Sequence, residues 1–285
     1  MIPQLSTYFQ QEALWAYPCT MRQEIISNLS PDYPWTDRFH FLPETGSTNL
    51  LLDKMAKEGA PHGTVVMADR QTDGRGRMGR SFLSPGGVGV YMSILLRPVC
   101  GPQQLMHLTC AAAVAMCDAV EAATGYRPGI KWTNDLVINR RKIAGILTKL
   151  ALSASGTIDY AIVGIGINCC QELADFPESL QATAGSLHTA LNAPISRPQV
   201  AAAMMESLWH MDQDLLSSQG EMLRQYRADC ITIGQDISLV RGSEIRHGKA
   251  LDVDSSGALV VQFSDGSIQA VSSGEVSVRG MYGYV

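Results

Sequence analysis

The sequence lacks the features that organise several common protein classes. Its 285 residues hold seven cysteines, an odd number without a CxxC pair, and six histidines that show no metal-ligand spacing. This excludes a disulfide framework or a zinc site as the basis of the fold and favours a reducing compartment, the cytoplasm. Charged residues make up 17% of the chain and hydrophobic residues 46%. The chain can therefore bury a substantial core.

Excess positive charge and long apolar runs are also missing. The 22 Lys and Arg are outnumbered by 27 Asp and Glu, which disfavours nucleic-acid binding through bulk charge. The N-terminus has no signal-peptide pattern, and the apolar stretch 110–120 is much shorter than the roughly 20 residues of a membrane span. We expect no DNA partner and no membrane partner.

Hydrophobic periodicity predicts an α+β fold with a mixed sheet. After Gly234 the pattern changes to five short alternating runs separated by Gly-rich turns, which indicates a small SH3-like β-barrel. We expect an N-terminal extension at 1–38, a main domain at 39–233 and this β domain at 234–285. The predicted strands of the main domain are 64–68, 90–96, 130–138, 143–150 and 160–167, and its predicted helices are 50–58, 103–124, 197–216 and 221–229.

A Gly- and Arg-rich segment, residues 70–80, carries the first chemical signal. Its glycines satisfy GxGxxG, but a dinucleotide-binding turn should open a helix and meet an acidic residue about 20 positions later. Pro85 prevents the helix, and the next acidic residue is Asp118. Arginines that converge on a Gly-rich chain indicate instead a loop that closes over a carboxylate or phosphate. A solvated charged loop is the ordinary alternative.

Two further segments place polar groups on apolar strands. Asn134 and Asp135 suit a hard cation such as Mg²⁺ held jointly with phosphate oxygens, and Lys142 starts the next strand. In the run 162–168, Gly164 and Gly166 share one strand face with an Asn, so that face is a bare floor on which a planar ligand or a second sheet can lie. An ordinary turn lysine and simple packing are the alternatives.

Together these segments resemble the biotin protein ligases, also called biotin–[acetyl-CoA-carboxylase] ligases. The resemblance covers residues 45–168 motif by motif, and the C-terminal β domain extends it. The motifs, in order, are STN at 47–49, GRGRMGR at 74–80 preceded by Gln71, SPGG at 84–87 before a strand ending LLRP, KWTNDL at 131–136, RKIAGIL at 141–147 and GIGIN at 164–168.

The resemblance implies an enzyme whose catalytic domain is 39–233 and which joins biotin and ATP to biotinyl-5′-AMP, then transfers biotin to a lysine of a biotin carboxyl carrier protein. It implies ATP and Mg²⁺ as cofactors and a monomer or homodimer. The implied catalytic residues are Lys142, Arg77 and Asp135, with Asp135 also the Mg²⁺ ligand. The implied biotin-binding residues are Ser47, Thr48, Asn49, Gln71, Gly74, Arg75, Gly76, Arg77, Lys142 and Gly145, and the implied ATP- or adenylate-binding residues are Arg77, Arg80, Phe82, Lys131, Asn134, Lys142 and Asn168.

Some positions depart from the family pattern. Thr133 replaces the usual Pro of KWPNDL, and Phe82 stands where many relatives have Trp. About 40 residues precede the resemblance, too few for the winged helix-turn-helix of the repressor members, so no DNA regulation is expected. The alternatives are a lipoate or octanoate ligase or transferase of the same fold, and a non-catalytic biotin-binding sensor.

Overall fold

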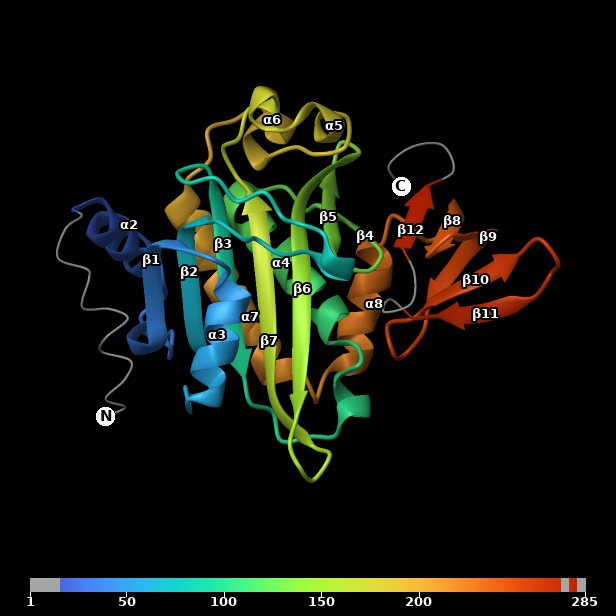
Figure 1. Ribbon diagram of the computed structural model, residues 1–285, viewed down its shortest axis with the longest axis horizontal. Coiled ribbons are helices and arrows are strands. Elements are labelled where there is room, and N and C mark those ends of the chain that lie inside the picture. Colours follow the sequence, from blue (N-terminus) through green and yellow to red (C-terminus); the bar gives the residue numbers. More distant parts are fainter. Residues whose placement is uncertain (1–15, 273–276, 281–285) are drawn as a thin grey trace.

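The computed structural model describes residues 16–272 and 277–280, and a mixed β-sheet forms its centre (Figure 1). Among these residues, seven strands pair in the order β1-β2-β3-β7-β6-β5-β4. β1 and β2 are parallel, and each other neighbouring pair is antiparallel. The strands are β1 (Phe39–Thr45), β2 (Thr64–Gln71), β3 (Gly89–Leu96), β4 (Gly129–Lys131), β5 (Asp135–Ile138), β6 (Arg141–Leu152) and β7 (Ile158–Asn168).

Helices cover both faces of this sheet (Figure 1). On one face α4 packs against α7 and α8, and α2 packs against α7 and β1. On the other face α3 lies over β2, β3 and β7. The helices are α2 (Ala16–Ser27), α3 (Thr48–Lys57), α4 (Leu108–Thr124), α5 (Glu178–Gln181), α6 (Leu187–Leu191), α7 (Arg197–Asp214) and α8 (Gln219–Asp229).

The two-residue period of the strands divides the core into two layers. On β7, Val163, Ile165 and Ile167 join the large core under α4 and α7, while Ile162 joins the smaller core under α3. The face that carries Gly164 therefore lies on the α3 side of the sheet, as the alternation predicts. The pocket described below opens on this side.

The C-terminal residues form a second sheet beside the first (Figure 1). Within the described part of the chain its five antiparallel strands run in the order β11-β10-β9-β8-β12. Trp132 attaches it to the main sheet by donating its indole N–H to the carbonyl oxygen of Gly257 at 3.0 Å. The strands are β8 (Asp236–Arg241), β9 (Glu244–Val253), β10 (Leu259–Phe263), β11 (Ile268–Val271) and β12 (Ser277–Gly280).

The predicted fold class is confirmed, but two predicted elements were wrong. The predicted strand 130–138 is two strands, because the chain turns between Lys131 and Asp135, which pair with each other. The predicted helix 103–124 begins with a separate 3-10 turn, Pro102–Leu105, before α4. The sequence analysis missed one strand, β1, which contains Pro43. A proline argues against a strand inside a sheet, but β1 lies at the sheet edge, where proline is tolerated.

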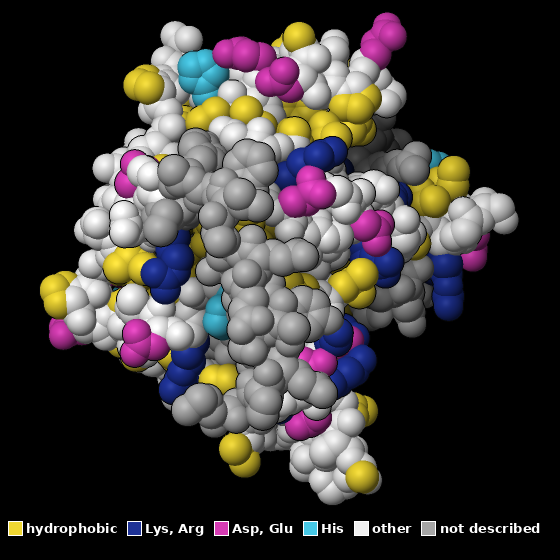
Figure 2. Space-filling view, turned by 60° about the vertical axis from the view of Figure 1, so that its left-hand side comes forward, with side chains coloured by type: hydrophobic (Ala, Val, Ile, Leu, Met, Phe, Trp, Pro, Cys, Tyr) yellow, Lys and Arg dark blue, Asp and Glu magenta, His cyan; other side chains and the backbone are white. Residues whose placement is uncertain are grey.

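Two features bear on the expected partners: an apolar helix and the distribution of charge on one face. Within the described residues one helical stretch, Pro102–Thr124, is long and apolar enough to cross a membrane, yet 72% of its apolar window is buried inside the protein, as in a core helix. On the face shown in Figure 2, Lys and Arg side chains are interspersed with Asp and Glu rather than gathered in one basic patch.

Candidate functional site

A pocket of about 970 Å³ lies on the α3 side of the sheet. The start of α3, the loop between β2 and β3, the β4–β5 turn and strands β6 and β7 contribute its walls. It gathers almost every residue that the sequence analysis had singled out, from segments more than 100 positions apart. Those that line it are Ser47, Thr48, Asn49, Gln71, Arg75, Gly76, Arg77, Arg80, Phe82, Lys131, Asn134, Asp135, Lys142, Gly145 and Asn168.

Gly74 has a different place from the others. It lies behind the wall, where an added Cβ would overlap the carbonyl oxygen of Phe82 and come within 2.7 Å of Ser84 Oγ. The backbone of Gly74 is also bonded to the far side of the loop, since Phe82 N–H donates to the Gly74 carbonyl at 2.8 Å. Gly74 is therefore required for close packing of the loop on itself.

One end of the pocket is polar but uncharged. Ser47 precedes α3 in extended conformation, so the next residue, Thr48, begins the helix with its N–H directed at Gln71. Gln71 Oε1 accepts from Thr48 N–H at 2.9 Å and lies 3.1 Å from its Oγ1. Gln71 Nε2 donates to Ser84 Oγ at 2.9 Å, and Ser84 donates to the carbonyl of Phe82 at 3.0 Å. This chain of contacts joins α3 to the loop.

The protein's own side chains cover the glycine floor of β7. The amide group of Asn49 lies where a Cβ of Gly164 would stand, and the ring of Phe82 lies where a Cβ of Gly166 would stand. Phe82 also approaches Gly145 on the neighbouring strand. The glycines thus allow a loop aromatic and a helix amide to rest on the sheet and shape the pocket.

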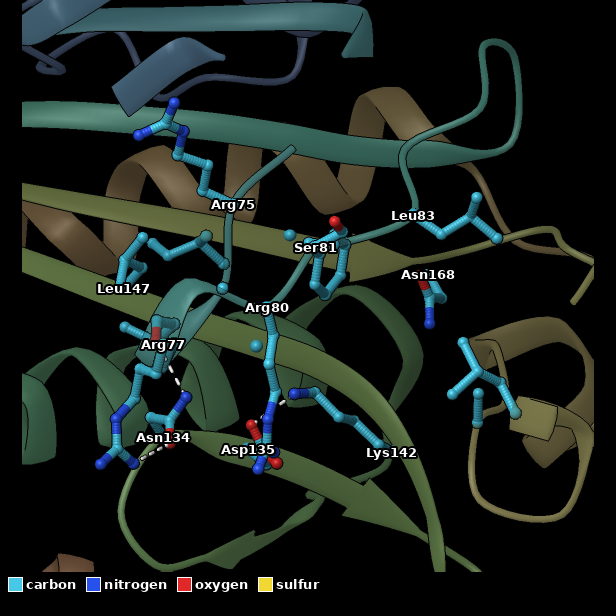
Figure 3. Close-up of a pocket in the computed structure, with 18 of the residues that line it drawn as sticks. Arg75, Arg77, Arg80, Ser81, Leu83, Asn134, Asp135, Lys142, Leu147 and Asn168 are labelled. Carbon is cyan, nitrogen blue, oxygen red and sulfur yellow. Dashed lines mark hydrogen bonds and ion pairs between the residues drawn. The ribbon is translucent and has the colours of Figure 1, made fainter. Parts of the chain in front are cut away.

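The other end of the pocket is charged. Arg77 donates to Asn134 Oδ1 at 2.8 Å, and Asn134 Nδ2 donates to the carbonyl of Ile146 at 3.0 Å. Lys142 Nζ lies 2.6 Å from Asp135 Oδ1. Burial lowers the pKa of the Arg77 guanidinium below its ordinary value, while nearby Asp135 opposes that change. Figure 3 shows these two pairs side by side on the pocket wall.

The remaining arginines of the loop point in different directions (Figure 3). Arg75 extends away from Asn134 and Asp135 and forms an exposed ion pair with Asp73 at 2.9 Å. Arg80 extends toward the Asp135 and Lys142 pair. On the opposite wall, Asn168 is buried and donates to the carbonyl of Gly185 at 2.9 Å.

Sequence reasoning missed several residues of this site. Phe176, Leu180 and Thr183 line the pocket from the segment after β7, and that segment is joined to β6 where Lys142 N–H donates to the Thr183 carbonyl at 2.8 Å. Val278 of β12 also lines it. None of these belongs to a recognisable motif, although the apolar Phe and Leu between polar residues at 176–180 could have suggested a covering segment.

The donor set at the charged end suits phosphate-bound magnesium better than an independent metal centre. Among the described residues, no three His, Cys, Asp or Glu side chains are grouped to hold a metal. Asp135 offers one carboxylate, with its side chain 20% exposed. Mg²⁺ in nucleotide sites commonly uses one or two carboxylates together with substrate phosphates. The residues present therefore fit a magnesium ion that arrives with a nucleotide.

Each of the two sheets lies in a segment that matches a known protein family. Residues 40–168 match the biotin/lipoate A/B protein ligase family, and residues 232–279 match the biotin protein ligase C-terminal domain. The first match contains every predicted site residue, from Ser47 to Asn168. The second covers the small antiparallel sheet.

Individual relatives extend the likeness over most of the chain. A bifunctional ligase/repressor BirA from Bacillus spizizenii is 34% identical over 233 residues, 81% of this chain and 71% of that protein. A biotin–[acetyl-CoA-carboxylase] ligase from Mycobacterium tuberculosis is 31% identical over 82% of this chain and 86% of its own length. The structure of a biotin protein ligase from Aquifex aeolicus in complex with biotin and ATP matches with a TM-score of 0.72 and 28% identity, covering 85% of this chain and 98% of that one.

Proposed function

We propose that this chain, which belongs to the biotin protein ligase family, activates biotin with ATP and transfers it to a lysine of a biotin carboxyl carrier protein. The observation that carries the proposal is a single pocket that joins an uncharged polar end, at Thr48 and Gln71, to a cationic end, at Arg77 and Lys142. A ligand with a neutral polar ring, an apolar chain and a carboxylate fits such a pocket. A nucleotide triphosphate fits the cationic end.

The first step joins two anions. A biotin carboxylate oxygen attacks the α-phosphorus of ATP, a new C(=O)–O–P bond forms, and the bond to the leaving pyrophosphate breaks. No side-chain nucleophile is needed, so catalysis consists of positioning and charge stabilisation. We assign Lys142 to the meeting point of the carboxylate and the α-phosphate. Its ammonium group lies 2.6 Å from the Asp135 carboxylate, which positions it in the pocket.

The bound ATP needs further positive charge and a metal. We assign Arg77, Arg80 and Lys131 to the phosphates and adenylate, and Asn134 and Asn168 to the polar rim of the same site. Mg²⁺ bound with ATP would supply charge neutralisation for the departing pyrophosphate. Asp135 would hold it.

The second step transfers the acyl group. The amino group of a carrier lysine attacks the acyl carbon, AMP leaves, and an amide bond forms. Until then the mixed anhydride must be kept from water, and we assign this task to the loop that contains Gly76 and Arg77. Arg77 supports it, because its contact with Asn134 fixes the loop across the pocket. We also propose a cytoplasmic location, in keeping with an acetyl-CoA carboxylase subunit as the proposed carrier.

Exchange of labelled pyrophosphate into ATP tests the assignment of the acid. We expect exchange that requires biotin and Mg²⁺ together. Lipoate and octanoate, the acids used by other members of the same fold family, serve as the matched alternatives. Exchange with either of these and none with biotin would contradict the proposal, and tight biotin binding without any exchange would identify a sensor instead.

A further inference from the structure

The turn between β4 and β5 carries three of the side chains assigned above to ATP and its metal, Lys131, Asn134 and Asp135. Lys131 and Asp135 pair with each other as the last residue of β4 and the first of β5. The direction in which the side chains of Asn134 and Asp135 leave the turn therefore depends on how the backbone of residues 132–134 is held.

Distant segments hold the first and last of these three residues. Trp132 N–H donates to Thr232 Oγ1 at 2.9 Å. Ile146 N–H donates to the Asn134 carbonyl at 2.9 Å, and Asn134 Nδ2 donates to the Ile146 carbonyl at 3.0 Å. The two ends of the turn are thus fixed by backbone contacts to the chain around them.

A buried tyrosine holds the middle residue, Thr133. The phenol of Tyr226, in α8, donates to the Thr133 carbonyl at 3.1 Å. Tyr226 is 0% exposed and Thr133 2%, and neither lines the pocket. Burial raises the pKa of Tyr226 well above its ordinary value, so the phenol keeps the hydrogen that it donates. Among the described residues, no other hydrogen bond reaches this carbonyl.

Thr133 brings little restraint of its own to the turn. A proline, which the family pattern KWPNDL has at this position, fixes its own φ through its ring, whereas threonine does not. In the described part of the chain Thr133 N–H donates no hydrogen bond, and the Thr133 hydroxyl has a long contact of 3.9 Å with Cys110 Sγ. The phenol of Tyr226 therefore supplies a restraint that the threonine lacks.

We propose that Tyr226 is a positioning residue for the nucleotide end of the pocket, because its hold on the Thr133 carbonyl sets the direction of Asn134 and Asp135 at the next two positions. The proposal rests on the proposed function, in which these side chains meet ATP and its Mg²⁺. Asn134 also accepts from Arg77 at 2.8 Å, so the restraint extends to the loop. The uncharged end of the pocket is held by separate contacts of its own.

Tyr226→Phe removes the hydroxyl and keeps the ring that fills the core. Two constants are measured with saturating biotin and Mg²⁺: the KM for ATP in pyrophosphate exchange, and the Kd for the unreactive analogue α,β-methylene-ATP by calorimetric titration. We expect both to rise about tenfold, as for the loss of one hydrogen bond. The Kd for biotin alone should stay within about twofold, because the uncharged end is held separately.

Tyr160→Phe is the matched control. Tyr160 is also a buried phenol, but it donates to Asp53 at 2.8 Å, and neither residue lines the pocket. Both variants should lower the free energy of unfolding measured with urea, because each loses one buried hydrogen bond. Only Tyr226→Phe should weaken the binding of the nucleotide.

A second substitution tests the route through Thr133. In a Thr133→Pro background, the proline ring restrains the turn without the phenol. Tyr226→Phe should then change the KM for ATP less than about twofold, against about tenfold when Thr133 is present. An equal effect of Tyr226→Phe in both backgrounds would place its action elsewhere and overturn the proposal.

The remaining outcomes are distinguishable. If wild type catalyses biotin-dependent exchange and Tyr226→Phe keeps both nucleotide constants, Tyr226 has no positioning role and the proposed function stands. Equal rises in the nucleotide and biotin constants, or the same rise in Tyr160→Phe, would show a merely structural tyrosine. If wild type neither binds biotin nor catalyses exchange with it, the proposed function itself fails.

Discussion

At one end of the pocket the polar side chains are neutral, largely buried and already hydrogen-bonded to one another. At the other end Arg77, Asp135 and Lys142 are charged and partly exposed, and they lie in a loop or at the ends of strands. Thr48 and Ser93 are buried, and their partners come from a helix and two neighbouring strands. Lys142 and Arg77 reach the pocket from the start of β6 and from a loop. In the proposed function, the residues that would bind a neutral ring therefore lie on a helix and two strands, and those that would bind phosphate lie in a loop and at strand ends.

The difference follows from what each end must do. A neutral ring is selected by polar groups whose positions are fixed in advance by their own hydrogen bonds, because a wrong ligand cannot match the remaining donors and acceptors. Phosphates enter and leave, and pyrophosphate departs during the reaction. The residues assigned to them carry charge, and Lys142 and Arg77 are positioned by Asp135 and Asn134.

The comparison predicts that the largest effect on rate arises at the charged end. Lys142→Met keeps most of the apolar stem and removes the ammonium group from the point where charge redistributes. We expect adenylate formation to slow by about 10²–10³, as when one electrostatic contact to a transition state is lost. Single-turnover assays should show a smaller loss when preformed biotinyl-AMP and carrier protein are supplied.

Lys149→Met is the matched control for this variant. Lys149 lies on the same strand, but its Nζ pairs with Asp53 at 2.6 Å outside the pocket. Adenylate formation at the wild-type rate is expected here. A wild-type rate in Lys142→Met as well would reduce Lys142 to an ordinary turn lysine.

A smaller effect, on retention rather than on formation, is expected from the loop. Arg77→Ala removes the charged donor that joins the loop to Asn134 at 2.8 Å. A hydrogen bond to a charged group contributes about 1.5–3 kcal/mol, so biotinyl-AMP should leave roughly 10–100 times faster. Release is measured by trapping free biotinyl-AMP, and the escaped adenylate should also label lysines of bystander proteins.

The neighbouring Arg70 tests whether any arginine of the segment has this effect. Its guanidinium lies 2.8 Å from Glu44, and both side chains are at least half exposed. Exposed pairs of this kind contribute about 0–1 kcal/mol. Arg70→Ala should release the adenylate at the wild-type rate, and unchanged release in Arg77→Ala would show that the loop is not the lid.

The sequence predicts the fold class and most of the pocket because both depend on local patterns. The alternation of Val163 and Gly164 assigns the two faces of β7 without knowledge of any neighbour. What covers that floor could not be predicted, since Phe82 reaches Gly166 only through the folded loop. The contact of Tyr226 could not be predicted either, because it lies in a helical pattern and its partner Thr133 is 93 positions away.

Errors in element boundaries have a similar origin. The turn between Lys131 and Asp135 contains no Gly or Pro, so the apolar pattern reads as one continuous strand. The break before α4 lies at Met106 and His107, where the pattern stays helical. In both places contacts between distant segments override the local preference, as when the buried His107 ring contacts the Leu215 carbonyl at 3.0 Å.

Substitutions of residues that support the uncharged end should change the stability of the protein rather than its reaction rate. Asp53 provides the last test. Asp53 fastens α3 to the sheet through Lys149 at 2.6 Å and Tyr160 at 2.8 Å, and it also accepts from Lys57. Burial alone would raise the pKa of Asp53, but these hydrogen bonds lower it from 3.8 to about 2. The folded-state pKa is depressed, so the stabilisation is present above pH 4 and is lost as the pH falls from about 4 to 2.

Asp53→Asn should therefore lower the free energy of unfolding by about 2 kcal/mol at pH 7 and by much less near pH 2, as followed by urea unfolding. The Kd for biotin of the folded variant should stay within about twofold of wild type, as expected for a support outside the pocket. A variant as stable as wild type at pH 7 would contradict the role of Asp53 in anchoring α3, and a large rise in the biotin Kd without loss of stability would show that the uncharged end depends on this charge directly.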